Sequence, residues 1–184
     1  KSAPSGCQSC AQQDMIEIGK EKYTPEKDKI IRSMLRQAPD EEAICDVVEA
    51  LSAYPEAALK RVAEYGTKLE VYDEDAGDKF PNYMPTLPDP RVVGAYNTAA
   101  NVLGMEDDDL SPFVLIHEFA HAIHLNGIFD VDTTFDKRLG KTYKAAMAKG
   151  LWKSKYAANN KAEYWAEGVQ SWFNTNRPPD HAHN

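Results

Sequence analysis

The sequence predicts an α+β fold, because amphipathic helical stretches at both ends of the chain flank a middle part with short strand-like runs. Helix-start residues followed by apolar residues every three to four positions mark the helical stretches. The length of 184 residues suits one domain, spanning residues 1–184, with a sizeable core. Residues 1–23 are expected to form an N-terminal segment ahead of the first helix.

The helices expected in the first part of the chain all begin with residues that favour a helix N-terminus. These are a side chain that can accept a backbone N–H, a proline at the first helical position, or an acid in the first turn. Apolar residues then recur along one face of each helix, which is the face expected to be buried. The expected helices run from Thr24-Pro25 to about Arg36, from Asp40 onward, and from after Tyr54-Pro55 to about Gly66.

Short β-rich runs predict strands in the middle of the chain. They lie at Leu69 and Val71, around Val92-Val93, and at Val102-Leu103. Between the first two runs, residues 73–89 are acidic and rich in proline. We expect a long loop there, and long loops in compact domains are often functional.

The charge balance excludes some classes of function. The 29 Asp and Glu residues outnumber the 21 Lys and Arg residues and give a net charge of −8, whereas a nucleic-acid binder normally carries a basic surface. The longest apolar run, Phe113 to Ile116, is far too short to span a membrane. The acidic clusters at 73–75 and 106–109 lack the spacing of an EF-hand and are expected to be solvated, although calcium binding there stays open. The oligomeric state is not predicted.

The three cysteines bear on the cellular compartment. A disulfide from Cys45 to Cys7 or Cys10 could tie the N-terminal segment to the domain, and the alternative is three reduced cysteines. The chain begins at Lys1, so we expect that a targeting signal has been removed and that the protein is secreted. The sequence leaves open whether the natural chain extends past Asn184.

A helix expected to begin at Ser111-Pro112 carries the motif H-E-x-x-H, formed by His117, Glu118 and His121. The two histidines lie one turn apart on one helix face, so both imidazoles can point at one metal ion. Glu118 is offset from the metal but can reach a water bound to it, which is the position of a general base.

Two histidines need a third protein ligand to form a catalytic zinc site. His124 lies too far along the same straight helix and is expected to be a structural or supporting histidine. His181 and His183 are expected not to be ligands. A helix that follows Asn160 carries Glu163 and Glu167 one turn apart, which offers one carboxylate for the metal and one to support a ligand histidine.

These elements together resemble the gluzincin metallopeptidases, in particular the catalytic domain of anthrax lethal factor and the bacterial Pro-Pro endopeptidases. The similarity extends from about residue 113 to about residue 173 and includes H-E-F-A-H-A, Tyr156 and the stretch E-Y-W-A-E. It implies a zincin-like fold, with a small twisted sheet packed on the H-E-x-x-H helix and additional helices. It also implies one Zn²⁺ bound by His117, His121 and Glu163, with Glu167 in support, Glu118 as general base, and Tyr156 as the phenol that stabilises the oxyanion.

The sequence therefore predicts a zinc metalloendopeptidase that hydrolyses peptide bonds. The expected partner is a peptide or protein bound in extended form along a sheet edge, with the strand at Arg91–Tyr96 as the candidate edge. The alternative is a catalytically inactive zincin-fold protein that keeps the zinc and serves as a binding module. The sequence does not predict which peptide is cleaved.

Overall fold

The computed structural model describes residues 23–73 and 93–176, and it confirms the α+β fold. The described α-helices are α1 (Pro25–Met34), α2 (Glu41–Leu51), α3 (Glu56–Glu64), α5 (Pro112–Ala122), α6 (Phe135–Ala148) and α7 (Lys161–Trp172). The described strands are β1 (Leu35–Gln37), β2 (Lys68–Tyr72), β3 (Gly94–Asn97) and β4 (Val102–Glu106). Shorter helical turns are η2 (Asp107–Asp109), η3 (Ile123–Ile128) and η4 (Tyr156–Ala158).

Some predictions concern residues outside the described ranges and stay predictions. They are the disulfide at Cys7 or Cys10, the loop after Asp73, the start of the candidate edge strand at Arg91-Val92, and the role of His181 and His183.

The helix starts predicted from the sequence are confirmed. The Thr24 hydroxyl accepts the N–H of Lys27 at 3.2 Å, and an Asp40 carboxylate oxygen accepts the N–H of Ala43 at 3.0 Å. Each side chain satisfies one of the N–H groups that the first turn of a helix leaves without a partner. The third helix ends before Gly66, as expected. The backbone of Gly66 has a φ of +86°, a conformation that favours glycine and commonly follows the end of a helix.

The strands form one mixed sheet in the order β1-β2-β4-β3. Strand β2 runs parallel to both β1 and β4, whereas β3 runs antiparallel to β4 and lies at one edge. The strands predicted at Leu69 and at Val102 are therefore present as β2 and β4. The strand predicted around Val92-Val93 begins slightly later, at Gly94.

The prediction for the end of the first helix is wrong. Helix α1 ends at Met34, and β1 occupies the positions that were expected to complete the helix up to Arg36. Leu35 pairs with Leu69 of β2, and the Arg36 side chain forms an ion pair with the buried Glu70. Pairing with a strand more than thirty residues away thus overrides the local helical periodicity, which carries no information about that partner.

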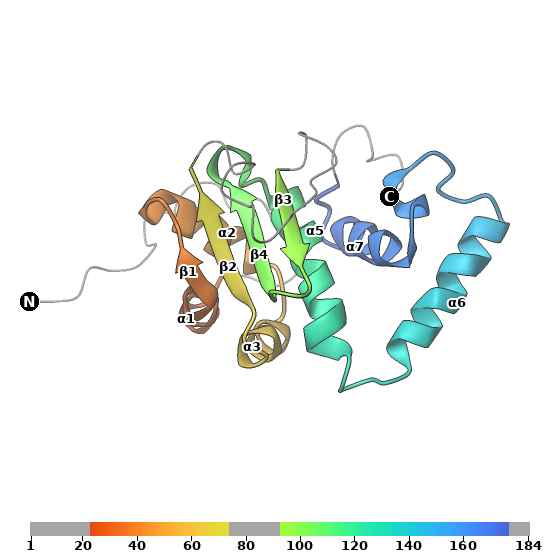
Figure 1. Ribbon diagram of the computed structural model, residues 1–184, viewed down its shortest axis with the longest axis horizontal. Coiled ribbons are helices and arrows are strands. Elements are labelled where there is room, and N and C mark those ends of the chain that lie inside the picture. The colour runs from red at the N-terminus through yellow and green to blue at the C-terminus, as the bar shows by residue number, and fades with distance from the viewer. Residues whose placement is uncertain (1–22, 74–92, 177–184) are drawn as a thin grey trace, which may run out of the picture.

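Helices α2 and α5 cover one face of the sheet, and α7 and α6 lie beyond the edge strand β3 (Figure 1). The described buried apolar residues form one cluster, to which the strands contribute alternate residues such as Leu69, Val71, Leu103 and Met105. Phe119 of α5 is fully buried in this cluster, and burying such a side chain contributes about 1.5–3 kcal/mol. The motif helix is thereby fixed in the core beside the edge strand.

Helix α6 has no counterpart in the sequence prediction. It is largely polar and exposed, with Leu139 and Ala146 as its buried residues and Gly140 in its interior. A weak apolar stripe and an internal glycine both reduce the helical signal. Among the described helices, none is long and apolar enough to cross a membrane.

Candidate metal centre

The candidate metal centre lies where α5 faces α7. His117 and His121 extend from α5 with ring centroids 5.1 Å apart. Glu163 extends from α7, and its Oε2 lies 2.8 Å from Nε2 of His117 and 3.6 Å from Nε2 of His121. One ligand atom from each of these three residues lies within 4.8 Å of the others. The residues predicted as ligands are therefore brought together by the fold.

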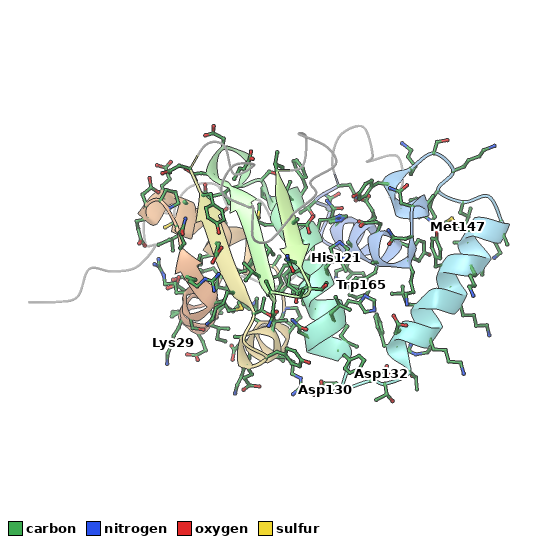
Figure 2. All side chains as sticks on the ribbon, viewed as in Figure 1. Lys29, His121, Asp130, Asp132, Met147 and Trp165 are labelled. Carbon is green, nitrogen blue, oxygen red and sulfur yellow. The ribbon has the colours of Figure 1, made fainter. Side chains whose placement is uncertain are left out.

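Helix α7 is held in place by contacts at its start and along its length. The Asn160 side chain caps it by accepting the N–H groups of Ala162 and Glu163 at 2.8 and 3.0 Å. The indole N–H of Trp165 donates to the carbonyl of Ala120 on α5 at 2.7 Å. In Figure 2, His121 and Trp165 lie close together where these two helices meet. The cap and the indole bond together fix the register of Glu163 against the histidines.

The carboxylate and one of the imidazoles form an ion pair in this arrangement. Burial alone would raise the pKa of Glu163, but the hydrogen bond with His117 and the nearby imidazole of His121 outweigh it and lower that pKa to about 2. Burial would lower the pKa of His117, but the carboxylates of Glu163 and Glu167 outweigh it and raise that pKa. Glu163 is thus held as the anion, which is the form that binds a metal.

Glu118 contacts the edge strand rather than the ligands. Its Oε2 accepts the backbone N–H of Tyr96 on β3 at 2.9 Å. Burial raises the pKa of Glu118, although the charges of His117 and His121 and the N–H of Tyr96 act in the opposite direction. A carboxyl with a raised pKa beside a metal site is suited to accept and return a proton at neutral pH.

The register of the sheet explains why the N–H of Tyr96 is available to Glu118. Glu106 donates its N–H to the carbonyl of Val93 at 2.9 Å, so these two residues form a hydrogen-bonded pair across β3 and β4. Such pairs alternate along antiparallel strands, so the N–H and C=O groups of Gly94 and Tyr96 point away from β4. The outer edge of β3 therefore faces the candidate site with its backbone groups directed outward.

The side chain of Tyr96 is held in place by hydrogen bonds of its hydroxyl group. Its hydroxyl donates to Oδ1 of Asn101 at 2.8 Å and accepts from Nδ2 of Asn126 at 2.7 Å. Asn126 lies in the π-helical turn η3 that continues α5, and it is buried. This network connects the end of the motif helix to the edge strand that contacts Glu118.

Tyr156 lies beside the ligands, on the short turn η4. Its ring centroid is 5.8 Å from that of His117, and the side chain is 53% exposed. Its position next to the ligand cluster is compatible with the predicted role, since a phenol there can reach a substrate bound between solvent and the ligands. The role itself stays a prediction.

Gln170 contacts a ligand histidine but is not among the residues predicted from the sequence. This residue is buried on α7, and its Oε1 lies 2.9 Å from Nδ1 of His117. Glu167, which was predicted to support a ligand histidine, lies farther from the same nitrogen, at 3.5 Å. Gln170 is seven residues after Glu163 and so lies on the same face of α7, a spacing that could have identified it.

His124 does not join the ligands. Its Nε2 lies 3.1 Å from Oδ1 of Asp136 on α6, and its ring packs against Phe135 and Trp165. This placement agrees with the predicted structural role. Oδ1 of Asp136 also accepts a hydrogen bond from the ammonium group of Lys161 at 2.5 Å, so this carboxylate contacts both His124 and Lys161.

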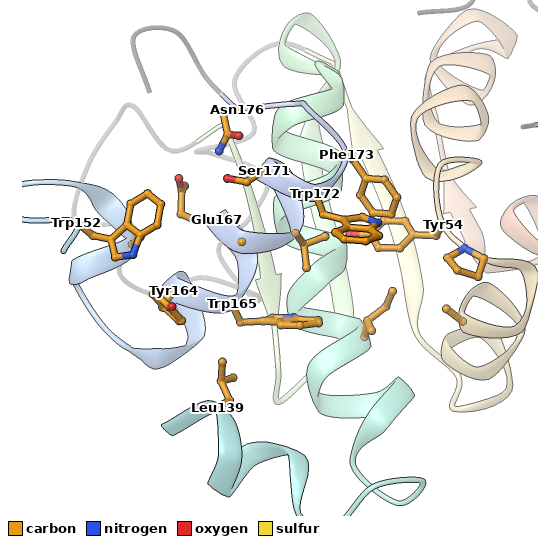
Figure 3. Close-up of a pocket in the computed structure, with 16 residues that line it drawn as sticks. Tyr54, Leu139, Trp152, Tyr164, Trp165, Glu167, Ser171, Trp172, Phe173 and Asn176 are labelled. Carbon is orange, nitrogen blue, oxygen red and sulfur yellow. The ribbon is translucent and has the colours of Figure 1, made fainter. Parts of the chain in front are cut away.

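A cavity of about 670 Å³ lies on another face of α7. Its lining is mainly aromatic and apolar and includes Tyr54, Trp165 and Phe173 (Figure 3). Glu167 belongs to this lining, whereas His117, His121 and Glu163 do not. The cavity is therefore separate from the ligand cluster.

The side chains of the cluster fit a zinc ion. Two imidazoles and one carboxylate are a donor set found in catalytic zinc sites that keep a position open for water. The residue that contacts a ligand also fits a zinc site. A ligand histidine normally donates its second N–H to an acceptor, and His117 has such an acceptor in Gln170.

Comparison with known proteins supports the fold. No protein-family profile matches the chain, and no curated protein sequence matches it. Among solved structures, the Pro-Pro endopeptidase PPEP-2 from Paenibacillus alvei matches with a TM-score of 0.55 at 14% sequence identity. The match covers 78% of this chain and 86% of that one. The chain thus has the zincin-like α+β fold of a Pro-Pro endopeptidase, and the resemblance found in the sequence is confirmed at the level of the fold.

Proposed function

We propose that the protein is a zinc-dependent endopeptidase. The observation that carries this proposal is the cluster of His117, His121 and Glu163, with Glu118 on the same helix and bonded to an outward-facing edge strand. A bound zinc ion supplies Lewis acidity to water and to the scissile carbonyl. The ion would be held by the three ligands of the cluster.

The residues of the chain divide the proton chemistry between them. Glu118 takes the proton of the attacking water on its carboxylate and gives it to the amine that leaves. The phenol of Tyr156 donates a hydrogen bond to the carbonyl oxygen as negative charge develops there. His117 and His121 remain ligands throughout and transfer no proton.

The proposed substrate is a peptide that adds to β3 as a further strand. The outward groups of Gly94 and Tyr96 offer it backbone hydrogen bonds. The N–H of Tyr96 is held by Glu118 in the structure, so a substrate carbonyl that binds this N–H releases Glu118 to act as the base. Because the similar solved structure is named a Pro-Pro endopeptidase, peptides with Pro-Pro pairs belong in the first substrate set.

The test combines metal analysis with cleavage of a peptide library. We expect about one zinc per chain and cleavage that a chelator abolishes. The Glu118→Gln variant should retain zinc and lose cleavage by at least about a hundredfold, because general acid–base catalysis contributes about that much. Glu64→Gln is the matched control, since Glu64 is exposed on the remote helix α3 and should keep both properties.

The results also separate the endopeptidase from the inactive binding module. If the wild type and Glu118→Gln both retain zinc and neither cleaves any peptide, the result would favour the binding module. Equal cleavage by the wild type and by Glu118→Gln would contradict the mechanism. A protein that binds less than one zinc per chain would contradict the metal centre itself.

We further propose that the protein is secreted, which detection of the chain outside the producing cell would test.

A further inference from the structure

The amide of Gln170 connects two parts of the motif helix. Its Nε2 donates to the carbonyl of Phe113 at 2.9 Å, and its Oε1 lies 2.9 Å from Nδ1 of His117. Phe113 precedes His117 by four residues, so both contacts are on the same face of α5. The Gln170 side chain therefore bridges α7 to two successive turns of α5.

The carbonyl of Phe113 determines which way the amide is turned. A carbonyl oxygen can only accept, so the end of the amide that faces Phe113 must be the NH₂ group. The oxygen is then directed at His117, and an oxygen can only accept from Nδ1–H. This leaves Nε2, the nitrogen that faces Glu163, as the ring atom able to bind a metal.

Glu167 is less well placed for the same task. Its carboxylate lies 3.5 Å from Nδ1 of His117, which is beyond a good hydrogen bond. Its side chain also lines the cavity on the other face of α7, where it is labelled in Figure 3. Gln170 is 3% exposed and is held at both ends of its amide, so its oxygen is the acceptor fixed in position.

We propose that Gln170 is the positioning residue that fixes the tautomer and ring orientation of His117 for metal binding, in place of a carboxylate. This inference rests on the proposed function, because it requires that the cluster binds zinc. A neutral acceptor orients the ring without adding a charge to the site. The partner of a ligand histidine typically changes metal affinity by about 10–100-fold when it is removed.

Two substitutions separate the two ends of the amide. Gln170→Leu removes both hydrogen bonds, whereas Gln170→Glu keeps an acceptor for His117 but loses the donor to Phe113. We expect zinc affinity, measured by competition with a chromogenic chelator, to fall about 10–100-fold in Gln170→Leu and to stay close to wild type in Gln170→Glu. Both variants should unfold at lower urea concentrations. Gln37→Leu, on the exposed strand β1, controls for the loss of an amide elsewhere.

A spectroscopic measurement tests the tautomer directly. In the zinc-loaded, ¹⁵N-labelled protein, His117 should show a slowly exchanging Nδ1–H and a metal-bound Nε2, and the Nδ1–H should exchange faster in Gln170→Leu. Zinc bound through Nδ1 would overturn the inference. Equal losses of affinity in Gln170→Leu and Gln170→Glu would reveal a merely structural residue and would also overturn it.

The remaining outcomes distinguish this inference from the proposed function. Equal zinc affinities of the wild type and Gln170→Leu would overturn the role of Gln170 and leave the endopeptidase proposal standing. A larger loss in Glu167→Gln than in Gln170→Leu would assign the role to Glu167 instead. A wild type that binds no zinc would overturn both proposals.

Discussion

Two glutamates of the candidate site are placed in environments that shift their pKa values in opposite directions. Glu163 lies 2.8 Å from an imidazole nitrogen of His117 and 3.6 Å from one of His121, and these two imidazoles outweigh its burial and lower its pKa. Glu118 is buried and accepts the backbone N–H of Tyr96, and burial raises its pKa. A ligand must remain an anion and a general base must exchange protons, so the opposite shifts match the roles proposed for these residues.

The role of Tyr156 leads to a prediction at the level of one hydroxyl. Tyr156→Phe removes a donor to the developing oxyanion, and we expect kcat to fall about 10²–10³-fold. KM and zinc content should stay close to wild type, because the ring remains beside His117. Steady-state kinetics on a peptide that the wild type cleaves would measure the change.

A matched control for this substitution is Tyr65→Phe. Both tyrosines are 53% exposed, but Tyr65 lies at the end of α3, away from the ligands. Equal kcat values for Tyr156→Phe and the wild type would show that the phenol has no part in the reaction.

The residues of the site differ in how well the sequence predicts them. His117, Glu118 and His121 follow from the spacing of one motif on one helix. The assignment of Glu163 to the metal came from the resemblance, because spacing alone leaves two glutamates on α7. Gln170 was not predicted, since an amide in a helix is usually unremarkable and its two partners come from another helix.

At the level of elements, the π-helical turn η3 connects the motif helix to its surroundings. It follows α5 without a break and places His124 and Asn126 in buried positions. His124 contacts α6 through Asp136, whereas Asn126 contacts the edge strand through Tyr96. π-Helical turns within helices occur often at functional sites, and this one holds the end of α5 against both neighbours.

The contact between η3 and α6 predicts a pH-dependent stability. Burial lowers the pKa of His124, and the charges of Lys161 and His121 add to this, although Asp136 acts in the opposite direction. The unfolded chain therefore takes up a proton on His124 at a higher pH than the folded chain does. This contribution to stability is complete above about pH 6.5 and decreases as the pH falls toward the lower pKa of the folded state.

Urea unfolding of the metal-free protein and of His124→Gln at pH 7.5 and pH 5.5 would measure this effect. The wild type should lose more stability on acidification than the variant, because the variant lacks the titrating ring. Other groups titrate in both proteins, and the comparison cancels them. An identical loss in the two proteins would contradict the prediction.

The elements that the sequence failed to predict depend on distant partners. The local periodicity predicts a helix at the residues of β1, because it does not encode their pairing with β2 or the ion pair of Arg36 with Glu70. Helix α6 was missed because its buried face is narrow. The capped helices with a clear apolar stripe were predicted correctly, since local capping and burial agree there.

At the level of the whole molecule, the outer edge of β3 and the charge of the chain would both act on the proposed peptide substrate. Strand β3 ends the sheet beside the ligand cluster, so an added peptide would extend the sheet past Glu118. The backbone groups of such an edge bind peptides of many sequences, because they contact no side chain. Discrimination must then come from side-chain pockets and from the electrostatic field of the protein.

The net charge of −8 predicts which peptides the protein should prefer. A peptide with flanking lysines is attracted by this field and one with flanking glutamates is repelled, so kcat/KM should be higher for the lysine peptide at low ionic strength. The ratio should decrease as salt is raised from about 10 mM to about 1 M, because the Debye length falls from about 30 Å to about 3 Å. A peptide with flanking serines is the neutral control and should show little dependence on salt. Faster cleavage of the glutamate peptide at low salt would show that local positive charge near the edge strand outweighs the net charge of the chain.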